Sequence, residues 1–225
     1  MNPLLSAWGS LIRTGFRLLY HEMSWSYDTV SHVVSLGHWQ EWRRACRPFL
    51  VGPVVLELGF GPGHLQVELS EWGFQPVGLD ASRQMAQQAS RRLQAANHPP
   101  ALVNGQAQYL PFPARRFNSV VATFPTPYIA EESTLLAVRR VLAPGGRLVI
   151  IPEAELEGGG PVQRVIDAAY RLTGQRPSLA VSPVRWSDLL CDRMSAVGLA
   201  AEIHDIPLPG SRVTAVVGEN ISPAK

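Results

Sequence analysis

The sequence predicts an α/β fold: a doubly wound sheet of seven strands, mostly parallel, that ends in an antiparallel hairpin. Two observations lead to this fold class. Between residues 54 and 151, short apolar runs rich in β-branched residues alternate with helical stretches, which is the pattern of parallel strands joined by crossover helices. Near the C-terminus, two strand-like runs are separated only by the turn residues Pro207–Gly210, and strands joined so closely pair antiparallel.

The individual elements follow from the same patterns. The first strand is expected over Val54–Leu58, because Pro53 and Gly59 bound a short and mostly apolar run. The other expected strands cover residues 76–79, 101–103, 119–123, 147–151, 200–206 and 211–218, and the expected helices cover 64–72, 83–96, 131–142, 162–172 and 186–197. The A-P-G-G sequence at 143–146 is expected to turn, and the acidic, glycine-rich stretch 153–160 is expected to form a loop.

The first 50 residues have a different character from the rest of the chain. Apolar residues between Leu4 and Leu19 recur at steps of three and four, and two further helical stretches follow at 26–36 and 38–46. We therefore expect residues 1–50 to form an N-terminal helical cap. Residues 51–225 are expected to form the core, with a lid insertion near 153–184. Cap and core together have the length of one compact domain.

The composition excludes several classes of protein. Apolar residues make up 46% of the chain and charged residues 17%, so the chain can bury a core and is not disordered. The formal net charge is only +2, which argues against a nucleic-acid partner. The only lysine is Lys225, so Schiff-base chemistry and a phosphate-binding loop with its lysine are excluded.

Metal sites and membrane spans are not expected either. Cys46 and Cys191 lie far apart, and the six histidines include no H-x-x-x-H pair, so we predict no metal site. No apolar run reaches the roughly 18 residues of a membrane-spanning helix, and we expect a cytoplasmic protein. For the helix over 4–19, packing on the domain is favoured, and weak contact with an anionic membrane surface stays open as the alternative. The oligomeric state is unknown at this stage.

The strongest functional signal is the sequence LELGFGPGHL at 56–65. Gly59, Gly61 and Gly63 follow a buried strand and open a helix, so the backbone can turn tightly with no side chain between it and a ligand. Asp80 stands at the end of the next strand, 21 residues after Gly59, where a carboxylate can accept both hydroxyls of a ribose. This arrangement predicts a ligand that contains adenosine.

The spacing of the glycines distinguishes between adenosine ligands. Dinucleotide sites place a pyrophosphate at a G-x-G-x-x-G turn, whereas here the order is G-x-G-x-G with Pro62 inside it. Glu57 precedes the turn by two residues, and an acid there disfavours a pyrophosphate but suits an ammonium group. S-adenosyl-L-methionine carries an ammonium and a sulfonium group, so it fits better.

With these residues in place, the sequence resembles the class I S-adenosylmethionine-dependent methyltransferases, which have a Rossmann-like fold. The segments that carry the resemblance are ELGFGPG (57–63), GLDASRQM (78–85), GQAQYLPFPARRFNSVV (105–121) and VRRVLAPGGRLVI (138–150). Within this family, residues 27–44 are similar to the start of the ubiquinone- and menaquinone-type methyltransferases.

The resemblance implies a role for each matching residue. Glu57 and the glycine turn, including Phe60, would hold the methionine part, and Asp80 would bind the ribose. The residues implied at the adenine are Ala81, Ser82, Met85, Gln106 and Ala107, with Gln106 standing where the family often has Asp. Phe124 would lie near the sulfonium. Tyr27 would reach the methionine carboxylate, with a packed core tyrosine as the equally favoured alternative.

No catalytic dyad is evident, so the catalytic residues are unknown. The candidates are His21 and His64 as proton acceptors, and Tyr128. The segment from Thr123 to Tyr128 invites comparison with the N/D-P-P-Y motif of enzymes that methylate amino groups of bases, but it has an extra residue and lacks the leading Asn or Asp. The cap residues Trp8, Trp25, Trp39 and Trp42 either pack the cap, which we favour, or line an apolar pocket.

We therefore expect a methyltransferase that moves a methyl group to a small, lipophilic, quinone- or lipid-like acceptor by in-line displacement. Such a reaction mainly requires that the acceptor and the methyl group are aligned in a dry cavity. Two alternatives stay open: a non-catalytic or membrane-associated protein that binds S-adenosylmethionine, and a nicotinamide-dependent oxidoreductase.

Overall fold

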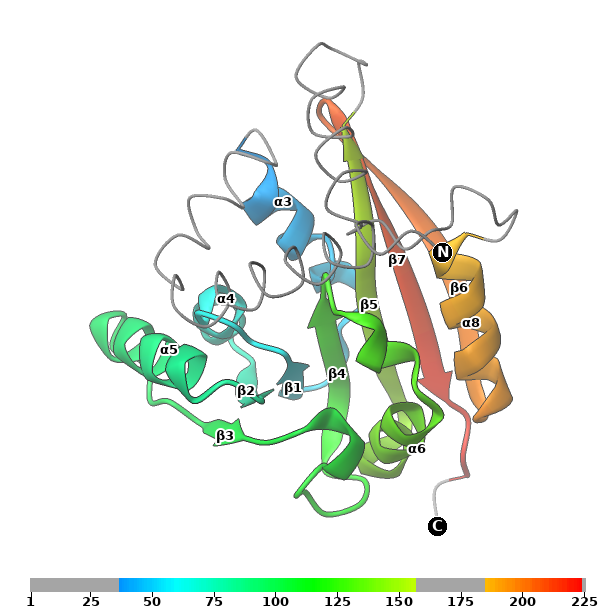
Figure 1. Ribbon diagram of the computed structural model, residues 1–225, viewed down its shortest axis with the longest axis horizontal. Coiled ribbons are helices and arrows are strands. Elements are labelled where there is room, and N and C mark those ends of the chain that lie inside the picture. The colour runs from blue at the N-terminus through cyan, green and yellow to red at the C-terminus, as the bar shows by residue number, and fades with distance from the viewer. Residues whose placement is uncertain (1–36, 157–184, 224–225) are drawn as a thin grey trace, which may run out of the picture.

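The computed structural model describes residues 37–156 and 185–223. Its centre is a seven-stranded sheet with the order β3-β2-β1-β4-β5-β7-β6 (Figure 1). The strands are β1 (Val54–Leu58), β2 (Gln75–Asp80), β3 (Leu102–Asn104), β4 (Phe117–Thr123), β5 (Leu142–Leu156), β6 (Leu199–Leu208) and β7 (Ser211–Asn220). The first five run parallel, whereas β7 pairs antiparallel with both β5 and β6. The predicted fold class is therefore confirmed.

Helices cover both faces of this sheet (Figure 1). The helices are α3 (Trp39–Arg44), α4 (His64–Glu71), α5 (Arg83–Ala95), α6 (Glu132–Val141) and α8 (Trp186–Ala196), with short 3-10 helices η1 (Arg47–Phe49), η2 (Ala107–Tyr109) and η3 (Pro127–Ala130). Buried apolar residues of α3 and α4 belong to one apolar cluster, and those of α6 and α8 belong to a second. α5 packs against α4, β2 and β3.

The side chains of β1 alternate between the two faces of the sheet. Val55 belongs to the cluster under α3 and α4, whereas Leu56 and Leu58 belong to the cluster under α6 and α8. Because successive side chains of a strand point to opposite faces, Glu57 lies on the same face as Val55. All five residues of β1 are buried, as expected for the central strand of a covered parallel sheet.

Strand β5 is much longer than the sequence suggested. It begins at Leu142, which pairs with Phe117 of β4, so the expected A-P-G-G turn at 143–146 lies within a strand that contains an irregularity. It also continues to Leu156, so the loop expected from residue 153 was wrong for residues 153–156. These residues pair with β7, where Glu153 stands opposite Thr214. The pairing with β7 extends the strand beyond the end of β4.

The terminal hairpin is tighter than expected for a similar reason. β6 continues through Pro207 to Leu208, and β7 starts at Ser211, so the turn consists of Pro209 and Gly210 alone. Proline at 207 is tolerated because β6 is the edge strand of the sheet, where one side makes no ladder hydrogen bonds.

Several expectations lie outside the described residues. These are the helices at 4–19, 26–36 and 162–172, the residues Trp8, His21, Trp25 and Tyr27, and the lid insertion from residue 157 to residue 184. Of the expected cap, the structure describes residues from Gly37 onward.

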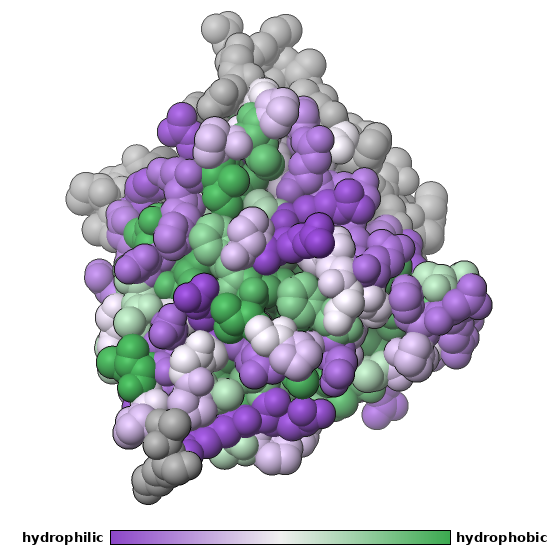
Figure 2. Space-filling model, turned by 180° about the vertical axis from the view of Figure 1, so that it is seen from behind, coloured by the Kyte–Doolittle hydropathy of each residue, from purple (hydrophilic) through white to green (hydrophobic). Residues whose placement is uncertain are grey.

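The side of the molecule away from the view of Figure 1 carries hydrophobic residues near its middle, bordered by hydrophilic ones (Figure 2).

The longest helix in the described part is α5, with 13 residues, and a helix that spans a bilayer requires about 20. This helix is therefore too short to span a bilayer, and no other helix in the described ranges is long and apolar enough to cross a membrane.

Candidate functional site

The site lies where the strand order reverses. From β1 the chain moves to β2 and β3 on one side, and it then returns to β4 and β5 on the other. In open α/β sheets, ligands bind outside the carboxyl ends of the strands at this point. Two segments meet there: the glycine turn after β1 and the segment from Phe124 to Tyr128 after β4. A Cβ placed on Gly59 would lie 3.0 Å from the Tyr128 hydroxyl, which shows how close these segments are.

The three glycines of the turn have different structural roles. All three have positive φ angles, +70° at Gly59, +53° at Gly61 and +84° at Gly63, which other residues rarely adopt. A Cβ on Gly63 would lie 2.6 Å from the Cβ of Ala89, so Gly63 allows α4 and α5 to pack closely. Within the ranges that the structure describes, a Cβ on Gly61 would meet no atom within 4 Å. As far as these residues show, the backbone at Gly61 therefore borders space that a ligand can approach.

Asp80 connects the glycine turn to the start of α5. One carboxylate oxygen, Oδ2, accepts a hydrogen bond of 2.9 Å from the Gly61 amide, and Oδ1 accepts one of 2.8 Å from the Ser82 amide. Ser82 in turn caps α5, because its hydroxyl accepts from the Met85 amide at 3.3 Å. Each carboxylate oxygen has a further lone pair. The carboxylate is therefore held in place and can still accept hydroxyl donors.

Glu57 is a buried carboxyl group, with 2% of its surface exposed. Burial raises its pKa to about 8, although the hydrogen bond from Gln66 and the charge of Arg43 oppose the increase. The side-chain nitrogen Nε2 of Gln66 donates to Glu57 Oε2 at 2.7 Å, whereas the side-chain oxygen Oε1 of Gln66 has no hydrogen-bond partner within the described residues. Glu57 is therefore mostly protonated at neutral pH. A cation bound nearby would stabilise its ionised form.

Tyr128 brings a hydroxyl group to the glycine turn. Burial raises the pKa of this phenol above its ordinary value, and the charges of Asp80 and Glu57 raise it further. Tyr128 therefore keeps its proton and can donate a hydrogen bond to a ligand, so a role as a general base is disfavoured. Proline at the first position of η3 and the contact of the tyrosine ring with the core hold the residue in place.

Phe124 follows β4 in an unusual backbone conformation. Its φ angle is +49°, which is an outlier for a bulky residue. Its amide donates to the carbonyl of Ile151 in β5 at 2.7 Å. Its ring stacks on that of Trp39 from α3, with 4.4 Å between the ring centroids and 27° between the planes. The Trp42 ring is tilted against both rings, with its centroid 6.3 Å from that of Phe124 and 6.4 Å from that of Trp39.

The other predicted ligand-binding residues surround the turn to different degrees. Phe60 and Met85 are buried, Ala81 and Gln106 are exposed, and Ala107 is buried at the start of η2 after β3. His64 is the first residue of α4, directly after the turn. Their roles toward the ligand stay predictions. Among the described residues, no group of three or more His, Cys, Asp or Glu side chains could hold a metal ion.

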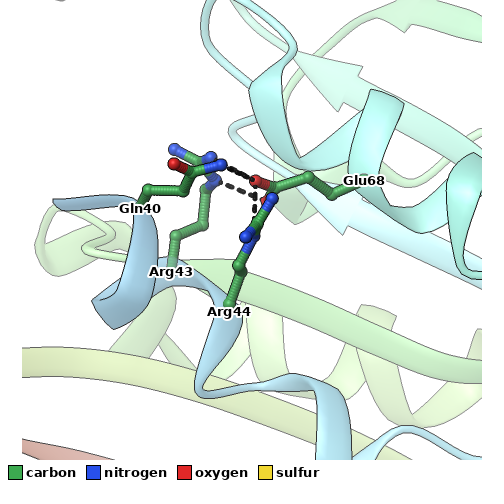
Figure 3. Close-up of polar contacts among 4 residues, drawn as sticks. All are labelled: Gln40, Arg43, Arg44 and Glu68. Atoms are coloured by element: carbon green, nitrogen blue, oxygen red, sulfur yellow. Dashed lines mark hydrogen bonds and ion pairs between the residues drawn. The ribbon is translucent and has the colours of Figure 1, made fainter. Parts of the chain in front are cut away.

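A charged cluster that sequence analysis missed fixes α3 to α4 (Figure 3). Glu68 accepts two hydrogen bonds from Arg43, of 3.0 Å and 2.7 Å, one of 2.9 Å from Arg44 and one of 3.3 Å from Gln40. Burial alone would raise the pKa of Glu68, but the hydrogen bonds and charges of the two arginines lower it overall. Arg43 and Glu68 are both buried. Arg43 and Glu68 are 25 residues apart in the sequence, and no local sequence motif predicts their pairing.

Comparisons with known proteins show the family to which this chain is related. The family described as methyltransferase domain matches residues 55–146. The demethylmenaquinone methyltransferase of Thermus thermophilus is 31% identical over 164 residues, which cover 70% of this chain and 72% of that protein. The enzyme of the same name from Symbiobacterium thermophilum is 31% identical over 67% of this chain and 61% of its own length.

Solved structures show the same fold. A methyltransferase described as putative from Bacillus halodurans superimposes with a TM-score of 0.58 at 16% identity, covering 81% of this chain and all of the other, 100%. A SAM-dependent methyltransferase from Aquifex aeolicus gives a TM-score of 0.54 at 16% identity, over 76% of this chain and 84% of the other.

Proposed function

Because this chain belongs to the family of S-adenosylmethionine-dependent methyltransferases that includes the demethylmenaquinone methyltransferases, we propose that it transfers a methyl group to a small, lipophilic, quinone-like acceptor. The names of the curated relatives support this acceptor class. The observation that carries the proposal is the Asp80 carboxylate, held between the amides of Gly61 and Ser82 at the point where the strand order reverses.

The residues present fit S-adenosylmethionine. Asp80 has free lone pairs for the ribose hydroxyls, and the open space beside Gly61 lets a ligand approach the backbone. Glu57 gains a charge when a cation lies nearby, which suits the ammonium group. The bound cofactor would supply a methyl group that is already activated by the positive sulfur.

The protein's own contribution is then mainly alignment and exclusion of water. The protonated hydroxyl of Tyr128 beside the glycine turn can donate a hydrogen bond to the bound cofactor, and the stacked rings of Phe124 and Trp39 provide an apolar boundary. A base is needed only if the acceptor must lose a proton. Since Tyr128 keeps its proton, His64 is the remaining candidate for that role in the part of the chain that the structure describes, and His21 is a candidate outside it.

The test is methyl transfer from isotopically labelled S-adenosylmethionine to a panel of demethylated quinols, aliphatic lipids and amines, scored by the mass of the product. We expect labelled product with quinols and a large loss of product with Asp80→Ala. Cofactor binding without transfer to any acceptor would favour the non-catalytic alternative. Binding of a nicotinamide dinucleotide in its place would favour an oxidoreductase.

A further inference from the structure

The stacked pair of Phe124 and Trp39 stands at the carboxyl edge of the sheet, on the side of β4. Val121 of β4 pairs with Glu57 of β1, so the chain leaves β4 toward Phe124 at the same edge of the sheet at which it leaves β1 into the glycine turn. Phe124 holds a left-handed backbone conformation there, with φ +49°. A bulky residue keeps such a conformation only when its surroundings over-determine it, and such outliers cluster at ligand-binding positions.

Trp39 is held in place by the rest of α3. This helix has only six residues and no side-chain cap, so it would not be stable alone. Two sets of contacts hold it: the charged cluster on Glu68 (Figure 3) and the bond of 2.9 Å from the Trp42 indole to the Ser211 hydroxyl in β7. Trp42 is buried, whereas Trp39 and Phe124 are half-buried. The contacts of α3 with Glu68 and Ser211 therefore fix the position of the half-buried Trp39 ring that stacks on Phe124.

We propose that Trp39 and Phe124 form the wall against which a flat aromatic ring of the methyl acceptor stacks. This inference rests on the proposed function and names the part of the same site that selects the acceptor. The two rings stack on each other with 27° between their planes, so the acceptor ring would extend this stack on an outer face, because aromatic faces favour offset stacking with another flat ring. An aliphatic ring of the same size lacks the matching π-face. The wall therefore selects planar acceptors over saturated ones.

The alternative is that the pair only packs α3 on the core, as the sequence favoured for Trp39. Packing alone predicts a loss of stability with no change in the choice of ligand. The two roles are separated by measuring ligand preference and stability in the same variants.

The test is calorimetric binding of dihydroxynaphthalene and of its fully saturated counterpart to the full chain with S-adenosylhomocysteine present. The variants are Trp39→Leu, which keeps apolar volume, and Trp39→Phe, which keeps a flat ring. The matched control is Trp72→Leu, because Trp72 is also a half-buried tryptophan of the same apolar cluster but lies at the C-terminal end of α4. Thermal unfolding is measured for each protein.

We expect the wild type to bind the flat compound about tenfold more tightly than the saturated one, in line with one or two aromatic contacts. Trp39→Leu should lose most of this preference, while Trp39→Phe and Trp72→Leu should keep it. An unchanged preference in Trp39→Leu, or no preference in the wild type, would overturn the wall. If Trp39→Leu loses the preference for the flat compound but the wild type methylates no acceptor, the proposed function is wrong, whereas the proposed stacking on Trp39 and Phe124 is supported.

Discussion

The two halves of the site are built in different ways. On the β1–β2 side, the glycine turn and Asp80 lie within 22 residues of one another in sequence and are joined by backbone amides. On the β4 side, Phe124 meets Trp39 of α3, and α3 is held by Glu68 and Ser211. The first half is local and set by the backbone, whereas the second is assembled from side chains of distant segments. We expect substitutions to affect the two halves separately.

The largest expected effect is the loss of stability when the charged cluster on Glu68, which holds α3, is disrupted. Glu68→Leu leaves Arg43 buried without its partner, which costs about 3–5 kcal/mol of folding free energy. The double variant Arg43→Met/Glu68→Leu should recover much of the loss, because an apolar pair of similar size replaces a buried ion pair. Urea unfolding checks both variants. A loss below about 1 kcal/mol for Glu68→Leu would show that the pair behaves like an exposed one.

The next effect concerns Glu57 and pH. Its pKa of about 8 in the folded protein lies above its value in the unfolded chain, 4.5, so the folded state binds more protons between these values. The stability from this group is complete below about pH 4.5 and is lost as the pH rises to about 8, by about 1.4 kcal/mol per pH unit. Glu57→Gln should therefore have a flatter pH profile of stability than the wild type. Unfolding from about pH 5 to 8 measures this difference, and parallel profiles would contradict the assignment.

Asp80→Ala tests the local half. The variant loses the acceptors for both ribose hydroxyls, and hydrogen bonds to a charged group contribute about 1.5 kcal/mol each at the low end of their range, so affinity for S-adenosylmethionine should fall at least about 100-fold. Preference for flat acceptors should remain, because the wall lies in the other half. Asp80→Asn, which keeps one acceptor oxygen, should show a smaller loss. Calorimetry that finds equal cofactor affinity for the wild type and Asp80→Ala would remove the ribose assignment.

The smallest expected effect is at Tyr128. Removing one neutral hydroxyl in Tyr128→Phe should weaken cofactor binding by about 1 kcal/mol, or about fivefold. Turnover at saturating cofactor should keep the pH dependence of the wild type, because the phenol stays protonated. A shifted pH profile would instead indicate that Tyr128 exchanges a proton with the substrate.

The same division explains what could be predicted from the sequence. Strand β1, the glycine turn and Asp80 follow from the alternation of apolar runs, glycine and acid, because each depends on neighbours along the chain. The extension of β5 to Leu156 was missed because it depends on pairing with β7, almost 60 residues later. The cluster on Glu68 and the stacking of Trp39 on Phe124 were missed because surface-type residues and aromatic rings carry no signal of a distant partner.

The central claim is that the glycine turn and Asp80 form a site for a sulfonium nucleoside. Calorimetric titration of the wild-type chain with S-adenosylmethionine, and in parallel with a nicotinamide dinucleotide, tests it most directly. We expect heat of binding with the first ligand and none with the second. Binding of the dinucleotide alone would contradict the account.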